Sequence, residues 1–278
     1  MSNERRDAEY TMGRTQSETD RLIKQSQLYD NVTRRFFLNS GITNGMKVLD
    51  VGSGAGDVAI TLADFVGEQG RVIGVDVNPD VLETAKNRAV AAGHKNIEFI
   101  AGDIRTLDLP NDFDAVAGRL VLMYMADPVE ALRHLTTLVK PGGIVAFQEA
   151  DFSPYQSTLH ADSPLINDLI EWGKAVFDKS GAHTEMGMDL YRVFVDAGLP
   201  EPTLHFETPM GGPPDWPGFA YLENSFRSIL PLIEKYEIAT AEQIDVDTLA
   251  ERIQKEVAAS KRPVMLPPHI TAHVVLPS

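Results

Sequence analysis

Apolar and polar positions change their spacing in regular blocks along the first half of the chain. Residues 16–40 place apolar side chains at helical spacing, and Gly41 is suited to end that helix. Short apolar runs then follow, separated by stretches with helical spacing; they are MKVLDV, RVIGVDV, NIEFIAGD, FDAVAGRLVL and IVAFQEAD. The stretches between them predict helices over 57–66, 79–92 and 128–139. Strands and helices in this alternation predict a parallel sheet covered by helices on both faces.

Beyond residue 151 the alternation loosens. Helical spacing over 164–180 and 188–197 precedes an apolar run at 203–210, which predicts a further strand. More helices are predicted within 219–260, and HITAHVVL near the end of the chain predicts a last strand. The helical stretch between these two strands is too short for a secure core of its own, so we expect it to pack over the sheet.

Composition narrows the class of protein. The chain has 278 residues, no cysteine and a formal net charge of −15. Its Lys and Arg residues are scattered, so nucleic acid, whose phosphates would be repelled, is not an expected partner. No apolar run reaches the length of a membrane span, and the polar N-terminus lacks the apolar core of a secretory signal. These features, with the absence of cysteine, fit a cytoplasmic protein.

The stretch VLDVGSGAGD places a glycine-rich turn between a predicted strand and a predicted helix. Gly52, Gly54 and Gly56 alternate with small residues, Ser53 among them, and Asp50 stands inside the strand end. Glycines let a ligand approach the backbone, and the following helix offers free N–H groups. The spacing G-x-G-x-G differs from the G-x-G-x-x-G of a dinucleotide site. A carboxylate here would repel a pyrophosphate and attract an ammonium or sulfonium group.

Acidic residues also end the next two predicted strands. Asp76 and Val77 lie in VIGVDVNP, where an acid is expected to accept hydrogen bonds from ribose hydroxyls. In AGDI, Asp103 is suited to accept from an exocyclic amine such as that of adenine, and the backbone N–H of Ile104 to donate to a ring nitrogen. One acid that binds ribose, one that accepts from the adenine amine and a turn that binds a cationic amino-acid end together match the chemistry of S-adenosylmethionine.

These motifs resemble those of a known family. VLDVGSGAGD, VIGVDVNP and AGDI are similar to successive motifs of the class I S-adenosylmethionine-dependent methyltransferases, and FDAVAGRLVLMYMADP and LVKPGGIVAFQEAD resemble that family's fourth and fifth strand motifs. The resemblance covers about 45–151, and the quinone-biosynthesis and small-molecule branches look most similar. It implies a Rossmann-like, doubly wound α/β fold with a seven-stranded, mostly parallel sheet whose last strand is antiparallel. It also implies S-adenosyl-L-methionine as methyl donor and S-adenosyl-L-homocysteine as product.

In those branches a helix before the first strand usually caps the cofactor, and YTMGRTQSETDRLIKQ resembles such a cap. The resemblance therefore implies that Tyr10, Arg14 and Gln25 reach the cofactor. The expected organisation is an N-terminal helical cap, the methyltransferase core, a helical insertion or lid and the final strand of the core; these are 1–41, 42–210, 211–264 and 265–278.

Methyl transfer from a sulfonium makes modest demands on side chains. The leaving group is a neutral thioether, so alignment and exclusion of water are the main tasks, and only a hydroxyl or carbon acceptor needs a general base. His183 in SGAHTEMG is the candidate base. Glu149 and Asp151 are weaker candidates for a base or a metal site, and no metal is predicted. Arg119 either pairs with a surface acid or lines the cofactor or substrate pocket.

The acceptor side is less determined. Aromatic and aliphatic residues of the 211–264 insertion either form a core or wall a pocket for an apolar or aromatic metabolite. The leading hypothesis is methyl transfer to O, N or C of such a small molecule. A nicotinamide dehydrogenase would need a different glycine spacing. A catalytically silent cofactor-binding scaffold or partner subunit is the alternative, and a homodimer is possible.

Overall fold

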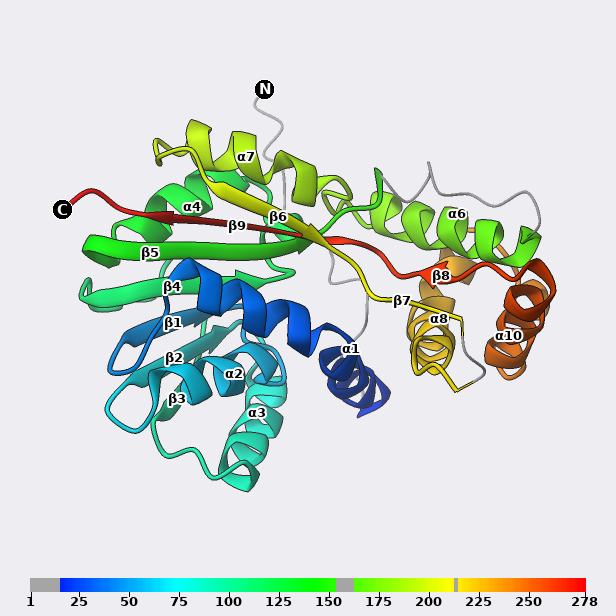
Figure 1. The fold of residues 1–278 in the computed structure, drawn as a ribbon, viewed down its shortest axis with the longest axis horizontal. Coiled ribbons are helices and arrows are strands. Elements are labelled where there is room, and N and C mark those ends of the chain that lie inside the picture. The colour runs from blue at the N-terminus through cyan, green and yellow to red at the C-terminus, as the bar shows by residue number, and fades with distance from the viewer. Residues whose placement is uncertain (1–15, 154–162, 213–214) are drawn as a thin grey trace.

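The computed structural model describes residues 16–153, 163–212 and 215–278, with side chains of the first helix described from Leu28 onward. Its centre is a seven-stranded sheet (Figure 1). In spatial order the strands are β3 (Ile97–Ala101), β2 (Arg71–Asp76), β1 (Lys47–Val51), β4 (Phe113–Arg119), β5 (Val139–Ala150), β9 (His269–Val275) and β6 (Thr203–Glu207). Neighbours from β3 to β5 run parallel, and β9 runs antiparallel to both β5 and β6. The predicted fold class is confirmed, including the antiparallel last strand.

Helices cover both faces of this sheet. One face packs against α1 (Gln16–Ser40) and α2 (Asp57–Val66); the other packs against α4 (Pro128–Thr136), α7 (Met186–Asp196) and the short 3-10 helix η1 (Leu122–Tyr124). The helix α3 (Pro79–Ala91) lies against β3. Successive strand residues point to opposite faces, so Val48 belongs to the cluster under α1 and α2 and Leu49 to the cluster under α7.

The helix predicted over 128–139 is shorter than expected. Asp127 caps α4 by accepting from the backbone N–H of Glu130, and the helix ends at Thr136. The chain joins the sheet already at Val139, which pairs with Phe113. The register then shifts, so residues 140–143 bulge before regular pairing resumes. The Pro-Gly-Gly signal therefore marks a bulge inside β5, not only the end of a helix.

A second helical part lies beyond the carboxyl ends of the parallel strands (Figure 1). It contains α6 (Pro164–Lys179), α8 (Gly218–Lys235), α9 (Ala241–Ile244), α10 (Leu249–Ser260) and the two-stranded sheet of β7 (Met210–Gly211) and β8 (Val264–Met265). Their apolar faces form one cluster, which Tyr29 of α1 joins. The expectation that the insertion packs over the sheet is wrong, because its helices bury their apolar faces against one another, α6 and α1.

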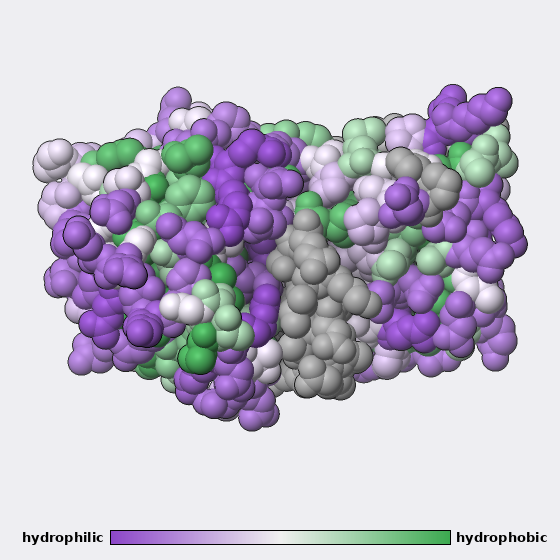
Figure 2. All heavy atoms as spheres, turned by 60° about the horizontal axis from the view of Figure 1, so that its bottom comes forward, coloured by the Kyte–Doolittle hydropathy of each residue, from purple (hydrophilic) through white to green (hydrophobic). Residues whose placement is uncertain are grey.

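Hydrophilic residues are spread over the face shown in Figure 2, with apolar residues in smaller groups between them. Charged residues make up 23% of the sequence, and such side chains are mostly exposed in folded proteins. None of the helices within the described ranges is long and apolar enough to cross a membrane.

Candidate functional site

The glycine turn connects β1 to α2 at the carboxyl edge of the sheet. Gly52, Gly54 and Gly56 have φ values of 66°, 51° and 85°, a backbone region that residues other than glycine rarely adopt. A Cβ on Gly52 would lie 2.7 Å from Cγ2 of Val121, and one on Gly56 would lie 3.0 Å from Cβ of Ala85. A Cβ on Gly54 would meet nothing closer than 4.0 Å, so the turn is packed at both ends and open in the middle.

Asp50 is completely buried beneath this turn. Its Oδ2 accepts a 2.7 Å hydrogen bond from the Ser53 hydroxyl, while its buried Oδ1 has no hydrogen-bond partner. Burial raises the pKa of Asp50 to about 7, against the opposing effects of Ser53 and the positive charge of Arg119. A buried carboxylate oxygen without a donor is costly, and a cationic group at this point would satisfy it.

Asp76 joins the end of β2 to the glycine turn. Its Oδ2 accepts from the backbone N–H of Gly54 and its Oδ1 from that of Asn78, both at 2.9 Å. Asn78 caps α3 by accepting from the backbone N–H of Asp80, as the helix signal in the sequence indicates. The side chain of Val77 is 63% exposed, so it stands outside the core.

Asp103 and Ile104 follow β3. The Arg105 guanidinium donates to both carboxylate oxygens of Asp103 and holds the pKa of that carboxyl below its usual range. The Ile104 side chain is buried in the core of the sheet, and its carbonyl oxygen lies 3.2 Å from Nε2 of His134. The role expected for Ile104 therefore depends on its backbone N–H alone, and that role stays a prediction.

Arg119 ends β4, and its side chain is only 8% exposed. Its Nη1 donates to the Thr33 hydroxyl at 3.2 Å, and its Nη2 lies 3.9 Å from Oδ2 of Asp57. The other oxygen of Asp57 accepts from Arg88 at 2.5 Å. Of the two alternatives for Arg119, pairing with a surface acid is wrong, because its guanidinium is enclosed and near the buried Asp50. Its contact with the cofactor or substrate stays a prediction.

The carboxylates of Glu149 and Asp151 accept hydrogen bonds from backbone N–H groups. Glu149 is buried and accepts from the N–H groups of Val121 and Leu122 at 3.0 and 2.9 Å, and burial raises its pKa to about 7. Asp151 accepts from the N–H groups of Ser153 and Met188. Within 16–153, 163–212 and 215–278, no group of three metal-ligating side chains converges. Both carboxylates stabilise loops at the carboxyl edge, which the sequence analysis did not anticipate.

His183 lies in the loop between α6 and α7 and is partly buried. Its backbone N–H donates to the Met123 carbonyl, and its Nε2 lies 3.0 Å from the Met125 carbonyl oxygen. A carbonyl only accepts, so Nε2 carries a proton, and in the neutral imidazole Nδ1 is then the nitrogen with a lone pair. The structure thus attaches His183 to the loop after β4, whose Val121 borders Gly52.

Three predicted cofactor contacts fall outside what the structure describes. Tyr10 and Arg14 precede the described residues, and Gln25 lies in α1 where only the backbone is described. Sequence reasoning missed a different set of residues at the same edge, Tyr29, Thr33, Gln148 and His269, which are all buried. The available signal was Gln148, which with Glu149 interrupts an apolar run in β5, because a buried polar side chain requires a partner.

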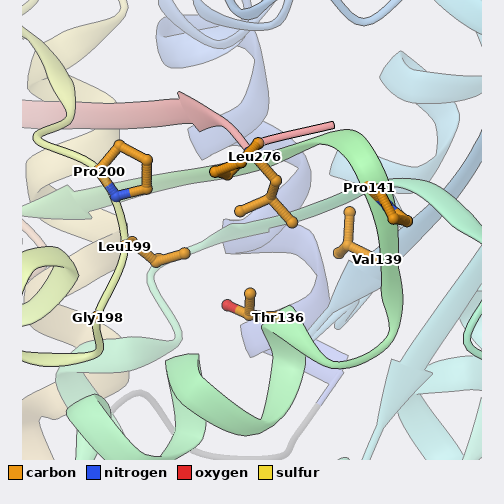
Figure 3. A pocket seen from close by; sticks show the side chains of 8 residues that line it. Thr136, Val139, Pro141, Gly198, Leu199, Pro200 and Leu276 are labelled. Carbon is orange, nitrogen blue, oxygen red and sulfur yellow. The ribbon is translucent and has the colours of Figure 1, made fainter.

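A cavity of about 560 Å³ lies at the opposite edge of the sheet (Figure 3). Val139 at the start of β5 and Leu276 after the end of β9 place it at the amino ends of the parallel strands. Its lining residues are Thr136, Val139, Pro141, Gly198, Leu199, Pro200, Leu276 and Pro277. This lining has no ionisable side chain, and we assign the functional site to the carboxyl edge.

A parallel sheet with a glycine turn, an under-bonded buried acid and further acids at successive strand ends defines an α/β protein that binds a nucleoside with a cationic substituent. Comparison with known proteins specifies the family. Residues 42–198 match the family model described as "Methyltransferase domain". The chain belongs to this family of class I S-adenosylmethionine-dependent methyltransferases, and S-adenosylmethionine is its cofactor.

Two sequence relatives and one solved structure illustrate the similarity. The ubiquinone/menaquinone biosynthesis C-methyltransferase UbiE of Pseudomonas putida (strain W619) is 31% identical over 62% of this chain and 72% of its own. The aklanonic acid methyltransferase DauC of Streptomyces sp. (strain C5) is 30% identical over 65% of this chain and 90% of its own. For other relatives the match spans as little as 45% of their length.

The solved structure is Haemonchus contortus phosphoethanolamine N-methyltransferase 2 in complex with phosphomonomethylethanolamine and S-adenosylhomocysteine. It shares the fold with a TM-score of 0.57 at 16% identity, over 94% of this chain and 58% of that one. At this identity the likeness concerns the fold alone.

Proposed function

We propose that this methyltransferase transfers the methyl group of S-adenosylmethionine to O, N or C of a small apolar or aromatic metabolite. One observation carries this proposal: the acidic glycine turn and the apolar helical part lie at the same edge of the sheet (Figure 1). A methyl donor bound at the turn would face a methyl acceptor bound by the helices. The names of UbiE and DauC, a quinone-biosynthesis and an aklanonic acid methyltransferase, agree with this acceptor class.

The donor's amino-acid end is a zwitterion, and the site offers a partner for each charge. Asp50 presents its unpartnered Oδ1 to the ammonium group. Arg119 is enclosed beside it and has N–H donors beyond the one that Thr33 accepts, which suits the carboxylate. Gly52 and Gly54 give the ligand access to the backbone, and Gly54 has open space above it.

The nucleoside end would lie along the next two strand ends. We assign the ribose hydroxyls to Asp76, with Val77 beside them, and the adenine amine and ring nitrogen to Asp103 and Ile104. Asp76 is already oriented by the N–H of Gly54, and Asp103 by Arg105. Each carboxylate oxygen retains lone pairs for a further donor.

The acceptor would bind where the helical part meets the sheet. Phe177 of α6 packs against both apolar clusters, and its ring centroid lies 5.1 Å from that of Phe152. Trp172 is a partly buried member of the same helix. We therefore propose that the insertion at 211–264 acts with α6 as the acceptor-side lid of the core.

His183 is our candidate general base. It follows Phe177 closely in the chain, and its Nδ1 is left to accept a proton because Nε2 donates to Met125. The donor supplies an electrophilic methyl group and a neutral leaving group, so His183 would matter for a hydroxyl or carbon acceptor. An amine acceptor would not require it.

Methyl transfer to a panel of phenols, quinols and polyketide-type aromatic acids tests the proposal. Release of S-adenosylhomocysteine and a product heavier by one methylene, measured by mass spectrometry, would support it. His183→Gln should lower kcat for hydroxyl or carbon acceptors and leave S-adenosylhomocysteine affinity unchanged. Turnover confined to peptide acceptors would contradict the small-molecule assignment, and cofactor binding without turnover of any acceptor would favour the silent scaffold.

The homodimer stays a prediction. The interface expected from the sequence involves the N-terminal helix or the aromatic insertion. Light scattering on the purified chain, with a mass twice that of one chain, would support it, and a single-chain mass would contradict it.

A further inference from the structure

A continuous series of buried polar side chains runs from Arg119 beneath α1 to the start of β9. Arg119 Nη1 donates to Thr33 Oγ1 at 3.2 Å, and the Thr33 hydroxyl donates to Gln148 Oε1 at 2.9 Å. Gln148 Nε2 lies 2.7 Å from His269 Nδ1. Thr33, Gln148 and His269 are each at most 2% exposed. We call these four residues the Arg119–His269 chain.

All donors in the Arg119–His269 chain point the same way. The Thr33 hydroxyl has one hydrogen, which it gives to Gln148, so it offers only lone pairs to Arg119. Gln148 then presents its amide hydrogens to His269, whose Nδ1 must be unprotonated. Burial, with the Arg119 charge second, lowers the pKa of His269 to about 3, so the ring is neutral at working pH. The series begins at a cation and ends at a neutral acceptor, which suits cooperative polarisation.

The far end of the chain is fixed by an aromatic contact. The His269 ring stacks on Tyr29 of α1 with centroids 3.9 Å apart and an interplanar angle of 11°. The Tyr29 hydroxyl donates to the Pro267 carbonyl at 2.9 Å, and its ring meets Tyr221 of α8 edge-on. The last acceptor is therefore held by α1, β9 and the helical part together.

The near end leaves Arg119 available to a ligand. Oδ2 of Asp57 lies 3.9 Å from Nη2 of Arg119, which is too far for a hydrogen bond, and Oδ1 of Asp57 accepts from Arg88 instead. The hydroxyl of Thr33 is thus the short-range acceptor that sets the direction of the guanidinium. An arginine fixed by a neutral hydroxyl keeps its full charge for an anionic ligand.

We propose that Thr33, Gln148 and His269 are positioning residues that direct Arg119 toward the carboxylate of the cofactor's amino-acid end. This inference rests on the proposed function of Arg119. It adds a source of cofactor affinity that lies outside the glycine turn and under the first helix. In this proposal the three positioning residues act through Arg119 and not on the reacting atoms.

The test compares two ligands on matched variants by calorimetry. S-adenosylhomocysteine carries the amino-acid carboxylate, and 5′-methylthioadenosine shares its nucleoside but lacks that group. Thr33→Val removes the hydroxyl at nearly constant volume, and Thr33→Ser keeps it. A bond to a charged group implies a loss of about tenfold in S-adenosylhomocysteine affinity for Thr33→Val, with 5′-methylthioadenosine unchanged. Thr33→Ser should bind both ligands like the wild type.

Two results would overturn the inference: Thr33→Val binding S-adenosylhomocysteine like the wild type, or losing both ligands equally. If Thr33→Val does not fold, His269→Phe provides the same comparison, because it keeps a ring against Tyr29 and removes the acceptor. Failure of the proposed function would look different. In that case the wild type would bind neither ligand, or the preference of the wild type for S-adenosylhomocysteine over 5′-methylthioadenosine would persist in Arg119→Ala.

Discussion

The glycine turn and the Arg119–His269 chain lie at the same edge of the sheet but arise from the sequence in opposite ways. The turn is one uninterrupted segment, in which each glycine is fixed by its own φ. The members of the chain bond across separations of 86, 115 and 121 residues. A local motif dictates its own conformation, whereas the chain exists only once α1, β4, β5 and β9 are assembled. In our proposal, the cofactor site therefore combines a segment that can be recognised in the sequence with a group of residues that only the folded structure brings together.

Crowding the turn should have the largest effect. Gly52→Val places a β-branched side chain at φ 66° with its Cβ 2.7 Å from Val121, so we expect cofactor affinity to fall by about 100-fold or more. Calorimetry with S-adenosylhomocysteine measures this. Gly93→Ala is the control, because Gly93 has φ 85° and open space around it. It should lose about 1 kcal/mol of stability and keep its affinity. Wild-type affinity in Gly52→Val would contradict the assignment of the turn.

Removing the charge of Glu149 tests the support behind the turn. Glu149→Gln can keep its amide oxygen on the N–H groups of Val121 and Leu122, but its NH₂ then faces the N–H of Met123. We expect the free energy of unfolding to fall by about 2 kcal/mol. Urea unfolding measures this. The pKa of Glu149 is raised to about 7, so the folded state binds the extra proton and the wild type loses stability as pH rises from about 4.5 to 7. The variant should lack this contribution, and an unchanged stability would argue against the loop-stabilising role.

The charge of Asp50 should make cofactor binding depend on pH. Its pKa is raised to about 7 in the free protein, so below pH 7 a cationic ligand must displace a proton from Asp50. We expect S-adenosylhomocysteine affinity to fall by up to about tenfold per unit from pH 7 to 5.5, where the ligand ammonium stays protonated. Asp50→Asn should bind about tenfold more weakly at pH 7.5, with a flatter profile. Parallel profiles for both proteins would contradict the ammonium assignment.

The smallest expected effect concerns the far end of the Arg119–His269 chain. His269 has a folded-state pKa lowered to about 3, so only the unfolded chain takes up its proton as pH falls below its ordinary value near 6.5. The wild type should therefore lose about 1 kcal/mol between pH 7.5 and 5.5 that His269→Phe does not lose. Urea unfolding of both proteins at the two pH values isolates this difference. Equal losses would show that His269 is accessible to protons in the fold.

The sequence predicted most of the sheet because each strand is marked locally. Alternating apolar strands and amphipathic helices determine the order of elements, and Asp50, Asp76 and Asp103 follow strand ends that must meet at one edge. The bulge in β5 was missed because Pro-Gly-Gly is equally a helix stop, and pairing with Phe113 decides between them. The location of the insertion was also missed, because an apolar helix face does not specify its partner.

The sequence indicated candidate site residues only where the ligand chemistry expected of them is local. Glu149 was a candidate base or metal ligand because the sequence does not show that the backbone of η1 donates to its carboxylate. Gln148 and His269 had no visible partner, since each finds the other across two neighbouring strands. Thr33 looks in the sequence like any small polar residue on a helix, because its partner Gln148 lies on the distant strand β5. Their contacts exist only because the topology of the sheet brings these residues together.

The most direct test of the account is calorimetric titration of S-adenosylmethionine into the full chain, beside Asp76→Ala and Asp80→Ala. Asp76 orients the turn through Gly54, whereas Asp80 is an exposed acid in the first turn of α3. We predict micromolar binding by the wild type and by Asp80→Ala, and its loss in Asp76→Ala. A folded wild type that does not bind, or an Asp76→Ala variant that binds equally well, would contradict the assignment of the carboxyl edge as the cofactor site.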